Sequence, residues 1–210
     1  MTYLITQSLL SSWNYQFNCM EGQEENARNE FIRTLHREPG EPTPAMIQGI
    51  EFEKKCYAVA NGAELWELDA EYNGVTAVAN IISGAQIQVK LKRTITVHGM
   101  DILVYGILDA LKAGVIYDIK RMYVKRHSDT MVYKELAGKY LNSPQHPTYF
   151  YLVPEADEFQ YLVSDGENLY IEKYSREETP DIRSIIDEFL RWLESEGLYE
   201  EYIKYWEAKS

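Results

Sequence analysis

The chain has 210 residues, of which 45% are apolar and 26% are charged, and these values suit one globular domain with a full hydrophobic core. No stretch approaches the roughly 18 apolar residues of a membrane span, and the first ten residues lack the pattern of a signal peptide, so we expect a cytoplasmic protein without membrane contact. The formal net charge of -12 argues against a protein that coats nucleic acid through overall positive charge, although it is compatible with one local basic track.

The chain contains two cysteines, Cys19 and Cys56. We expect free thiols, because disulfides are rare in cytosolic proteins. Two thiolates are too few for a common iron–sulfur cluster, and the pair lacks the close spacing of a structural zinc site. The cysteines therefore suggest no cofactor.

The first third of the chain predicts three helices. Apolar residues recur at helical spacing over about residues 8–17 and 24–37. The proline-rich segment 39–44 interrupts this pattern. Thr43 can cap a third helix over about residues 44–61, which ends near Gly62.

The period then changes to that of strands. Residues 86–98 alternate between apolar and polar side chains, which predicts a half-buried strand with a partly basic outer face. Further strands are expected over about 101–110, 115–122, 159–163 and 169–173, the last two joined at Asp165-Gly166. Helices are expected over about 130–141 and 147–152, and two more between 181 and 208.

This order of elements predicts an α+β, or mixed α/β, fold with a central mixed sheet flanked by helices. We expect a single domain over residues 1–210, with a core of about residues 4–175 and C-terminal helices over about 180–208. Such amphipathic helices usually bury their apolar stripe against the rest of the domain, although they could also bind a partner.

The segment from Gly106 to Lys120 carries the strongest chemical signal. If Ala113-Gly114 forms a two-residue hairpin loop, Asp109 faces Asp118 across the hairpin, and Lys120 lies on the same face as Asp118. Two opposed carboxylates repel each other, and a divalent cation would compensate for this. Because carboxylates are hard oxygen ligands, we expect Mg²⁺ or Mn²⁺, with Lys120 offsetting the remaining negative charge.

Asp109 followed by Asp118-x-Lys120 resembles the core motif of the PD-(D/E)XK nucleases. Leu108 stands where that motif has proline, and Gly106-x-x-Asp109 instead resembles the RecB-type exonuclease branch, which includes phage and CRISPR-associated enzymes. Three more segments resemble that branch in the same order over roughly residues 4–152: Ser8-Leu9-Leu10 in the opening helix, Gly49 to Glu53, and Gln145 to Tyr149. The resemblance implies a restriction-endonuclease-like core. The four cluster-binding cysteines of some members are missing.

The resemblance also implies roles for individual residues. Asp109 and Asp118 would be metal ligands together with the carbonyl group of Ile119, and Lys120 would be catalytic. Glu53 stands where the family has a histidine ligand, and its carboxylate is an acceptable substitute for Mg²⁺. Glu51 is a rival, but it lies about 200° from Glu53 around a helix, so only one of the two should face the metal.

Gln145 and Tyr149 would contact DNA or support the site. A basic cluster follows the motif, and we expect its members to contact phosphate: Arg121, Lys125 and Arg126.

The resemblance implies a metal-dependent DNA nuclease, in first place an exonuclease of recombination, repair or phage DNA processing, with DNA and a recombination or repair protein as partners. Two alternatives stay open: a catalytically silent module that binds DNA or protein on the same fold, and an acidic protein that mimics DNA. A helicase or ATPase would be a separate chain, because the sequence has no Walker A pattern. The strandedness and polarity of the substrate and the oligomeric state are left open.

Overall fold

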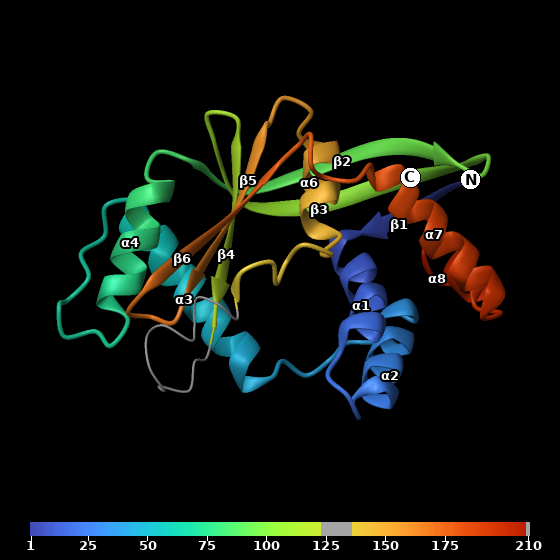
Figure 1. Ribbon diagram of the computed structural model, residues 1–210, viewed down its shortest axis with the longest axis horizontal. Coiled ribbons are helices and arrows are strands. Elements are labelled where there is room, and N and C mark those ends of the chain that lie inside the picture. Colours follow the sequence, from blue (N-terminus) through green and yellow to red (C-terminus); the bar gives the residue numbers. More distant parts are fainter. Residues whose placement is uncertain (123–135, 209–210) are drawn as a thin grey trace.

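The computed structural model describes residues 1–122 and 136–208 and has an α+β fold, as the order of elements predicted (Figure 1). Its strands are β1 (Thr2–Thr6), β2 (Gln86–Val97), β3 (Met100–Lys112), β4 (Val115–Arg121), β5 (Glu158–Ser164) and β6 (Leu169–Ser175). They form one six-stranded mixed sheet in the order β1-β3-β4-β5-β6, with β2 paired to β3. β1–β3 and β4–β5 are parallel pairs, whereas the other pairs are antiparallel.

Helices lie on both sides of this sheet (Figure 1). Those of the described residues are α1 (Gln7–Asn18), α2 (Glu24–Leu35), α3 (Pro44–Ala60), α4 (Tyr72–Ile82), α6 (Gln145–Leu152), α7 (Ile182–Ser195) and α8 (Tyr199–Tyr205). Thr6 and Thr43 cap α1 and α3 by accepting hydrogen bonds from backbone N–H groups of the first turn. None of the described helices has the length and apolar composition needed to cross a bilayer.

Most of the expected elements are present within a few residues of their expected bounds, but two were missed. β1 has no partner nearby in sequence and forms through parallel pairing with β3, from Thr2 opposite Asp101 to Thr6 opposite Tyr105. α4 does carry a helical pattern, because its buried residues Val75, Val78, Ala79 and Ile82 recur at helical spacing, and this pattern could have revealed it. The helix expected over 130–141 falls largely outside the described residues.

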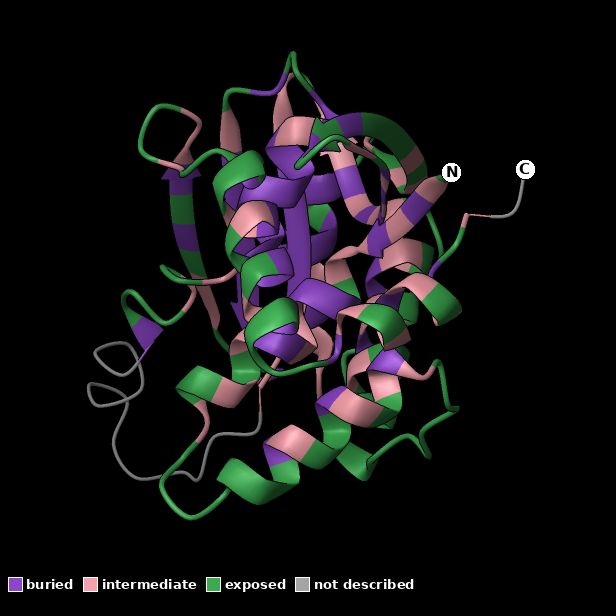
Figure 2. Ribbon diagram, turned by 90° about the vertical axis from the view of Figure 1, so that its right-hand side faces the viewer, coloured by how far each residue is buried: buried purple, intermediate pink, exposed green. Residues whose placement is uncertain are grey.

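Within the described part of the chain, the buried apolar side chains form two clusters. The larger one packs α1, α2, α6, α7 and α8 against the sheet, and its members include Phe31, Phe159 and Phe189. The smaller one packs α3 and α4 against β4 and β5, through residues such as Phe52, Val78 and Ile119. Figure 2 shows this distribution, with buried strands in the centre and exposed outer faces on the helices. Cys19 and Cys56 are free thiols.

The C-terminal helices pack on the same core as the sheet. Phe189 of α7 contacts Trp13 of α1 with ring centroids 5.4 Å apart. The segment after α8 pairs with β1, where the Leu4 N–H donates to the Trp206 carbonyl oxygen at 2.7 Å. The last described residues, 206–208, therefore lie beside β1 (Figure 1).

Strand β3 changes partner along one of its edges. β2 occupies one edge from Met100 to Leu111. On the other edge, β1 pairs with residues up to Tyr105 and β4 pairs only from Ala110 onward. The stretch from Gly106 to Asp109 thus lies between the two partners, where β3 and β4 diverge.

Candidate active site

The β3–β4 hairpin has the predicted register. Lys112 pairs with Val115, Leu111 with Ile116 and Ala110 with Tyr117. The two loop residues, Ala113 and Gly114, have φ values of 49° and 81°. This is the left-handed conformation of a type I′ hairpin turn, which costs alanine more than glycine.

The backbone ladder of the hairpin ends before the acidic pair. It stops at Ala110 and Tyr117, so Asp109 and Asp118 are not joined by backbone hydrogen bonds as the next rung. Instead the Asp109 carboxylate accepts a hydrogen bond from the Ile119 N–H at 2.8 Å. The side chain of Asp109 thereby bridges the two strands where they separate.

Asp118 lies at the centre of the site. Its side chain is 3% exposed, and one carboxylate oxygen lies 2.7 Å from the Lys120 ammonium group. The other oxygen accepts a hydrogen bond from the Gln145 amide of α6. Burial raises the pKa of Asp118, although Lys120 and Gln145 oppose the shift. The structure thus brings together three residues that the resemblance singled out.

Asp109 and Glu53 complete an acidic group around Asp118. Burial, together with the charges of Asp118 and Glu53, raises the pKa of Asp109 to about 8. The pKa of Glu53 on α3 is also raised, first by burial and then by Asp118. Glu51 is exposed on the same helix. Of the two rivals, the structure therefore places Glu53 near the aspartates.

Helix α6 supports this group from the other side. Tyr149, one turn after Gln145, donates a hydrogen bond to the Ile107 carbonyl oxygen at 2.8 Å. Its ring lies so close to β3 that a Cβ on Gly106 would be 2.6 Å from a ring carbon. Gly106 is therefore needed for the close approach of α6 to the edge of β3.

Two further residues next to the acidic group were missed by the sequence analysis. Tyr57 follows Glu53 by one helical turn, and its hydroxyl accepts a hydrogen bond from the Gln88 amide at 2.8 Å. Burial raises the pKa of Tyr57, and Asp109 and Glu53 raise it further. Gln88 lies on β2 at the level of Asp109, between two regular pairs of the ladder. The i, i+4 spacing from Glu53 could have revealed Tyr57.

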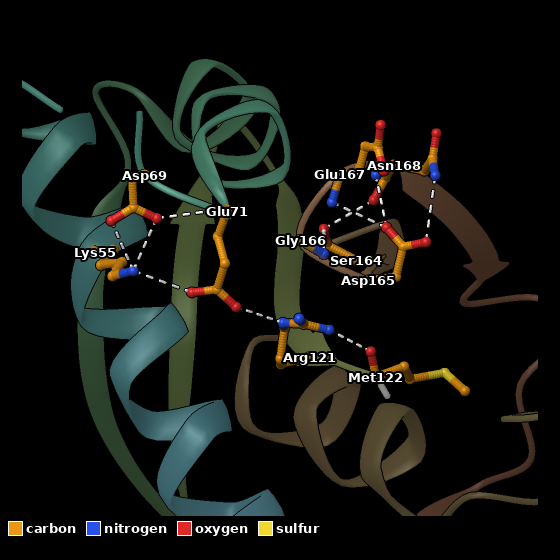
Figure 3. Close-up of polar contacts among 10 residues, drawn as sticks. All are labelled: Lys55, Asp69, Glu71, Arg121, Met122, Ser164, Asp165, Gly166, Glu167 and Asn168. Carbon is orange, nitrogen blue, oxygen red and sulfur yellow. Dashed lines mark hydrogen bonds and ion pairs between the residues drawn. The ribbon is translucent and has the colours of Figure 1, made fainter. Parts of the chain in front are cut away.

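Arg121 is paired on the side of the sheet that faces α3. Its guanidinium group lies 2.7 Å from the Glu71 carboxylate and also donates to the Met122 carbonyl oxygen (Figure 3). Glu71 in turn lies 3.2 Å from Lys55, which also contacts Asp69. A phosphate would have to compete with Glu71 for Arg121. Lys125 and Arg126 lie outside the described residues, so their expected phosphate contacts stay predictions.

The donor chemistry of the site fits a divalent cation. Asp109 and Asp118 offer hard oxygen ligands, and the charge of Lys120 lowers the pKa of Asp109. However, within residues 1–122 and 136–208 no group of three histidine, cysteine or acidic residues is close enough to hold a metal ion. The structure therefore shows the two aspartates together, and a role for Glu53 as third ligand requires its side chain to move toward them.

Removing the charge of Asp109 is expected to stabilise the metal-free protein at high pH. Neutral Asp109 is favoured in the folded state, where its pKa is about 8, compared with 3.8 for an ordinary aspartate. The contribution of Asp109 to the free energy of unfolding is therefore fully present below pH about 4, and it is lost as the pH rises through about 8. Asp109→Asn should raise the free energy of unfolding by roughly 1–2 kcal/mol at pH 9.

Urea unfolding of wild type and Asp109→Asn in EDTA between pH 5 and pH 9 measures this difference. Asp101→Asn is the matched control, because Asp101 is exposed on the same strand. Mn²⁺ should stabilise the wild type more than Asp109→Asn. Equal stability of the wild type and Asp109→Asn at pH 9, with no preferential stabilisation by Mn²⁺, would contradict the assignment.

No family model and no curated protein matches this chain. Among solved structures, the crystal structure of SSO0001 is 15% identical, covers 96% of this chain and 76% of its own, and has a TM-score of 0.49. The crystal structure of Scheffersomyces stipitis Rai1 is 11% identical with a TM-score of 0.39, and the match covers 92% of this chain and 61% of Rai1. At these scores, neither likeness bears on the activity of this chain.

Proposed function

We propose that this protein is a metal-dependent phosphodiesterase that cleaves DNA. The observation that carries the proposal is the buried Asp118 carboxylate, paired with Lys120 at 2.7 Å and adjacent to Asp109, where two strands diverge. Neighbouring buried carboxylates are costly unless they serve a purpose, and such perturbed groups cluster at functional sites. Metal-assisted hydrolysis of a phosphodiester uses oxygen ligands to hold the metal ion, and a nearby cation can stabilise the charge on the phosphate.

Asp109 and Asp118 would hold the cation, with Glu53 as the third acidic ligand and the Ile119 carbonyl as a backbone ligand. When bound, Mg²⁺ or Mn²⁺ would supply activation of water and stabilisation of charge on the phosphate.

Lys120 acts in its charged form in this proposal. Burial disfavours the ammonium form, yet the carboxylates of Asp118 and Asp109 keep the pKa of Lys120 above its usual value. A charged lysine cannot accept a proton from water, so its role is to stabilise negative charge that develops on the phosphate. In this proposal Lys120 is therefore not the general base.

Gln145 and Tyr149 hold the site in place. The Gln145 amide donates to the Asp118 carboxylate and fixes the orientation of that side chain. Tyr149 anchors the same helix to β3 through the Ile107 carbonyl oxygen.

A catalytically silent binding module is the second candidate. The observation in its favour is that the described acidic residues do not form a ready-made group of three metal ligands. The retained Asp109, Asp118 and Lys120 favour the enzyme, because a site without catalysis has no need for buried like charges.

Digestion of end-labelled linear DNA and closed circular DNA with Mg²⁺, Mn²⁺ or EDTA tests the proposal. We expect metal-dependent cleavage by the wild type and none by Asp118→Asn. The circular substrate shows whether a free end is needed, as expected of an exonuclease. Asp187→Asn on α7 is the control for a general loss of negative charge.

Two outcomes would count against the enzyme. Absence of cleavage with either metal, while DNA is still bound, favours the silent module. Cleavage that survives in Asp118→Asn points to a contaminating nuclease. A role in recombination or repair, with a partner protein, stays a prediction that this assay does not address.

A further inference from the structure

Strand β2 carries a short basic row on its outer face. We define the β2 row as Gln88, Lys90 and Lys92, which are all exposed. Successive side chains on one face of a strand lie about 6.6–6.8 Å apart along it. β2 is hydrogen-bonded only to β3 among the described strands, so it forms an edge of the sheet.

The row leads to the acidic group of the active site. Lys92 is opposite Tyr105, Lys90 is opposite Ile107, and Gln88 lies at the level of Asp109. Directly opposed residues project from the same face of a sheet. The row, the odd-numbered residues of β3 and Asp109 therefore share one face.

The two lysines have no acidic partner among the described residues. No ion pair or hydrogen bond involves the side chain of Lys90 or Lys92 in residues 1–122 and 136–208. Neighbouring Arg93, in contrast, donates to the Tyr151 carbonyl oxygen at 3.0 Å and stacks on the Tyr151 ring. In a chain of net charge -12, these two lysines are cations that an anion can reach, on the same strand face as Asp109.

A cleft lies next to the β2 row, on the neighbouring strand β3. It has a volume of about 220 Å³ and is lined by residues from the end of β1, the start of α1, β3 and α6, among them Ser8, Tyr105, Ile107 and Tyr149. Tyr105, an aromatic residue opposite Lys92, is one of the residues that line this cleft. Single-strand binding sites combine such aromatic rings with cations that follow the backbone.

We propose that the β2 row binds the phosphodiester backbone of single-stranded DNA and directs that strand to Asp109 and Asp118. Lys90 and Lys92 contact successive stretches of the backbone, and a base enters the cleft beside Tyr105. A row of two cations on one strand matches one nucleic-acid backbone. This inference rests on the proposed function, because it names the path of the DNA to that site.

Binding of a fluorescently labelled oligothymidylate in EDTA tests the row without cleavage. The affinity is measured by anisotropy at several KCl concentrations. The double variant Lys90→Gln/Lys92→Gln should bind on the order of tenfold more weakly at low salt, and its log–log salt slope should be smaller by about 1.4, since each contact to single strands contributes about 0.7. Lys173→Gln/Lys204→Gln is the matched control, because it makes the same charge change on β6 and α8.

The control should keep the affinity and salt slope of the wild type. An unchanged salt slope in the row variant, or an equal loss in the control, overturns the proposal. A loss that affects only blunt duplex DNA also overturns it, because the row would then contact a duplex.

The outcome is separable from that of the proposed function. If the row variant loses binding but the wild type never cleaves DNA, the binding role of the β2 row is supported and the proposed nuclease function is contradicted. If the wild type cleaves DNA and the row variant keeps the same KM for single strands, the nuclease function is supported and the binding role of the row is contradicted.

Discussion

Replacing Lys120 with methionine is expected to destabilise the metal-free protein by about 2–3 kcal/mol. The reason is that Asp118, with a side chain 3% exposed, would lose the cation that lies 2.7 Å away. Removal of one partner from a buried ion pair leaves an uncompensated charge. The cost is below that of a fully buried pair, because the Lys120 side chain is 33% exposed.

A double-mutant cycle measures this effect. Urea unfolding in EDTA is compared for wild type, Lys120→Met, Asp118→Asn and the double variant. The double variant should recover most of the stability that Lys120→Met loses, because no unpaired carboxylate remains. Lys90→Met is the control and should stay within about 0.5 kcal/mol of the wild type, since its side chain is exposed.

The same substitution should also remove cleavage. Loss of a group that stabilises transition-state charge lowers kcat by on the order of 10²–10³. Mn²⁺ should restore part of the stability of Lys120→Met by compensating Asp118, but it should not restore the rate. Full activity in a folded Lys120→Met variant would exclude the catalytic role of Lys120.

Gly106→Ala is expected to cost about 1–3 kcal/mol of stability through overpacking. The new Cβ would lie 2.6 Å from a ring carbon of Tyr149 and 3.0 Å from a methyl carbon of Leu152. Helix α6 would have to move away from β3. Because α6 also carries Gln145, the hydrogen bond to Asp118 should weaken, and DNA cleavage should fall as well.

Gly49→Ala provides the matched control for Gly106→Ala. Gly49 lies within α3, and a Cβ there would meet no atom within 4 Å. Alanine is the better helix former, so this variant should gain up to about 1 kcal/mol. Thermal unfolding of both variants measures the difference. If Gly106→Ala were as stable as the wild type, α6 could move away from β3 without lowering the free energy of unfolding, and the prediction would be wrong.

Local signals in the sequence determined the hairpin that carries the site. The alternation of side chains and the loop at Ala113-Gly114 fixed the pairing of Ala110 with Tyr117. A slip by one residue would turn the apolar face of the strands to solvent. The helices before residue 62 were also predictable, because Thr43 and the apolar spacing act over only a few residues.

Contacts between distant segments decided the rest. β1 forms only because β3 offers a free edge, and the smaller core buries one face of α4 through Val75, Val78 and Ile82. Strand divergence, which no sequence pattern marks, ended the ladder before Asp109 and gave its carboxylate the Ile119 N–H. Packing of α3 likewise placed Glu53 near Asp118 and left Glu51 exposed.

The basic residues illustrate the same division. The sequence showed that Arg121 directly follows Lys120 and that Lys90 and Lys92 lie on one strand face. Only the tertiary structure gave Arg121 its Glu71 partner, 50 positions away in the sequence, and left the two lysines without a partner among residues 1–122 and 136–208. The residue type alone gives the charge of a side chain. Whether an opposite charge lies close enough to neutralise it depends on which distant segments the fold brings beside it.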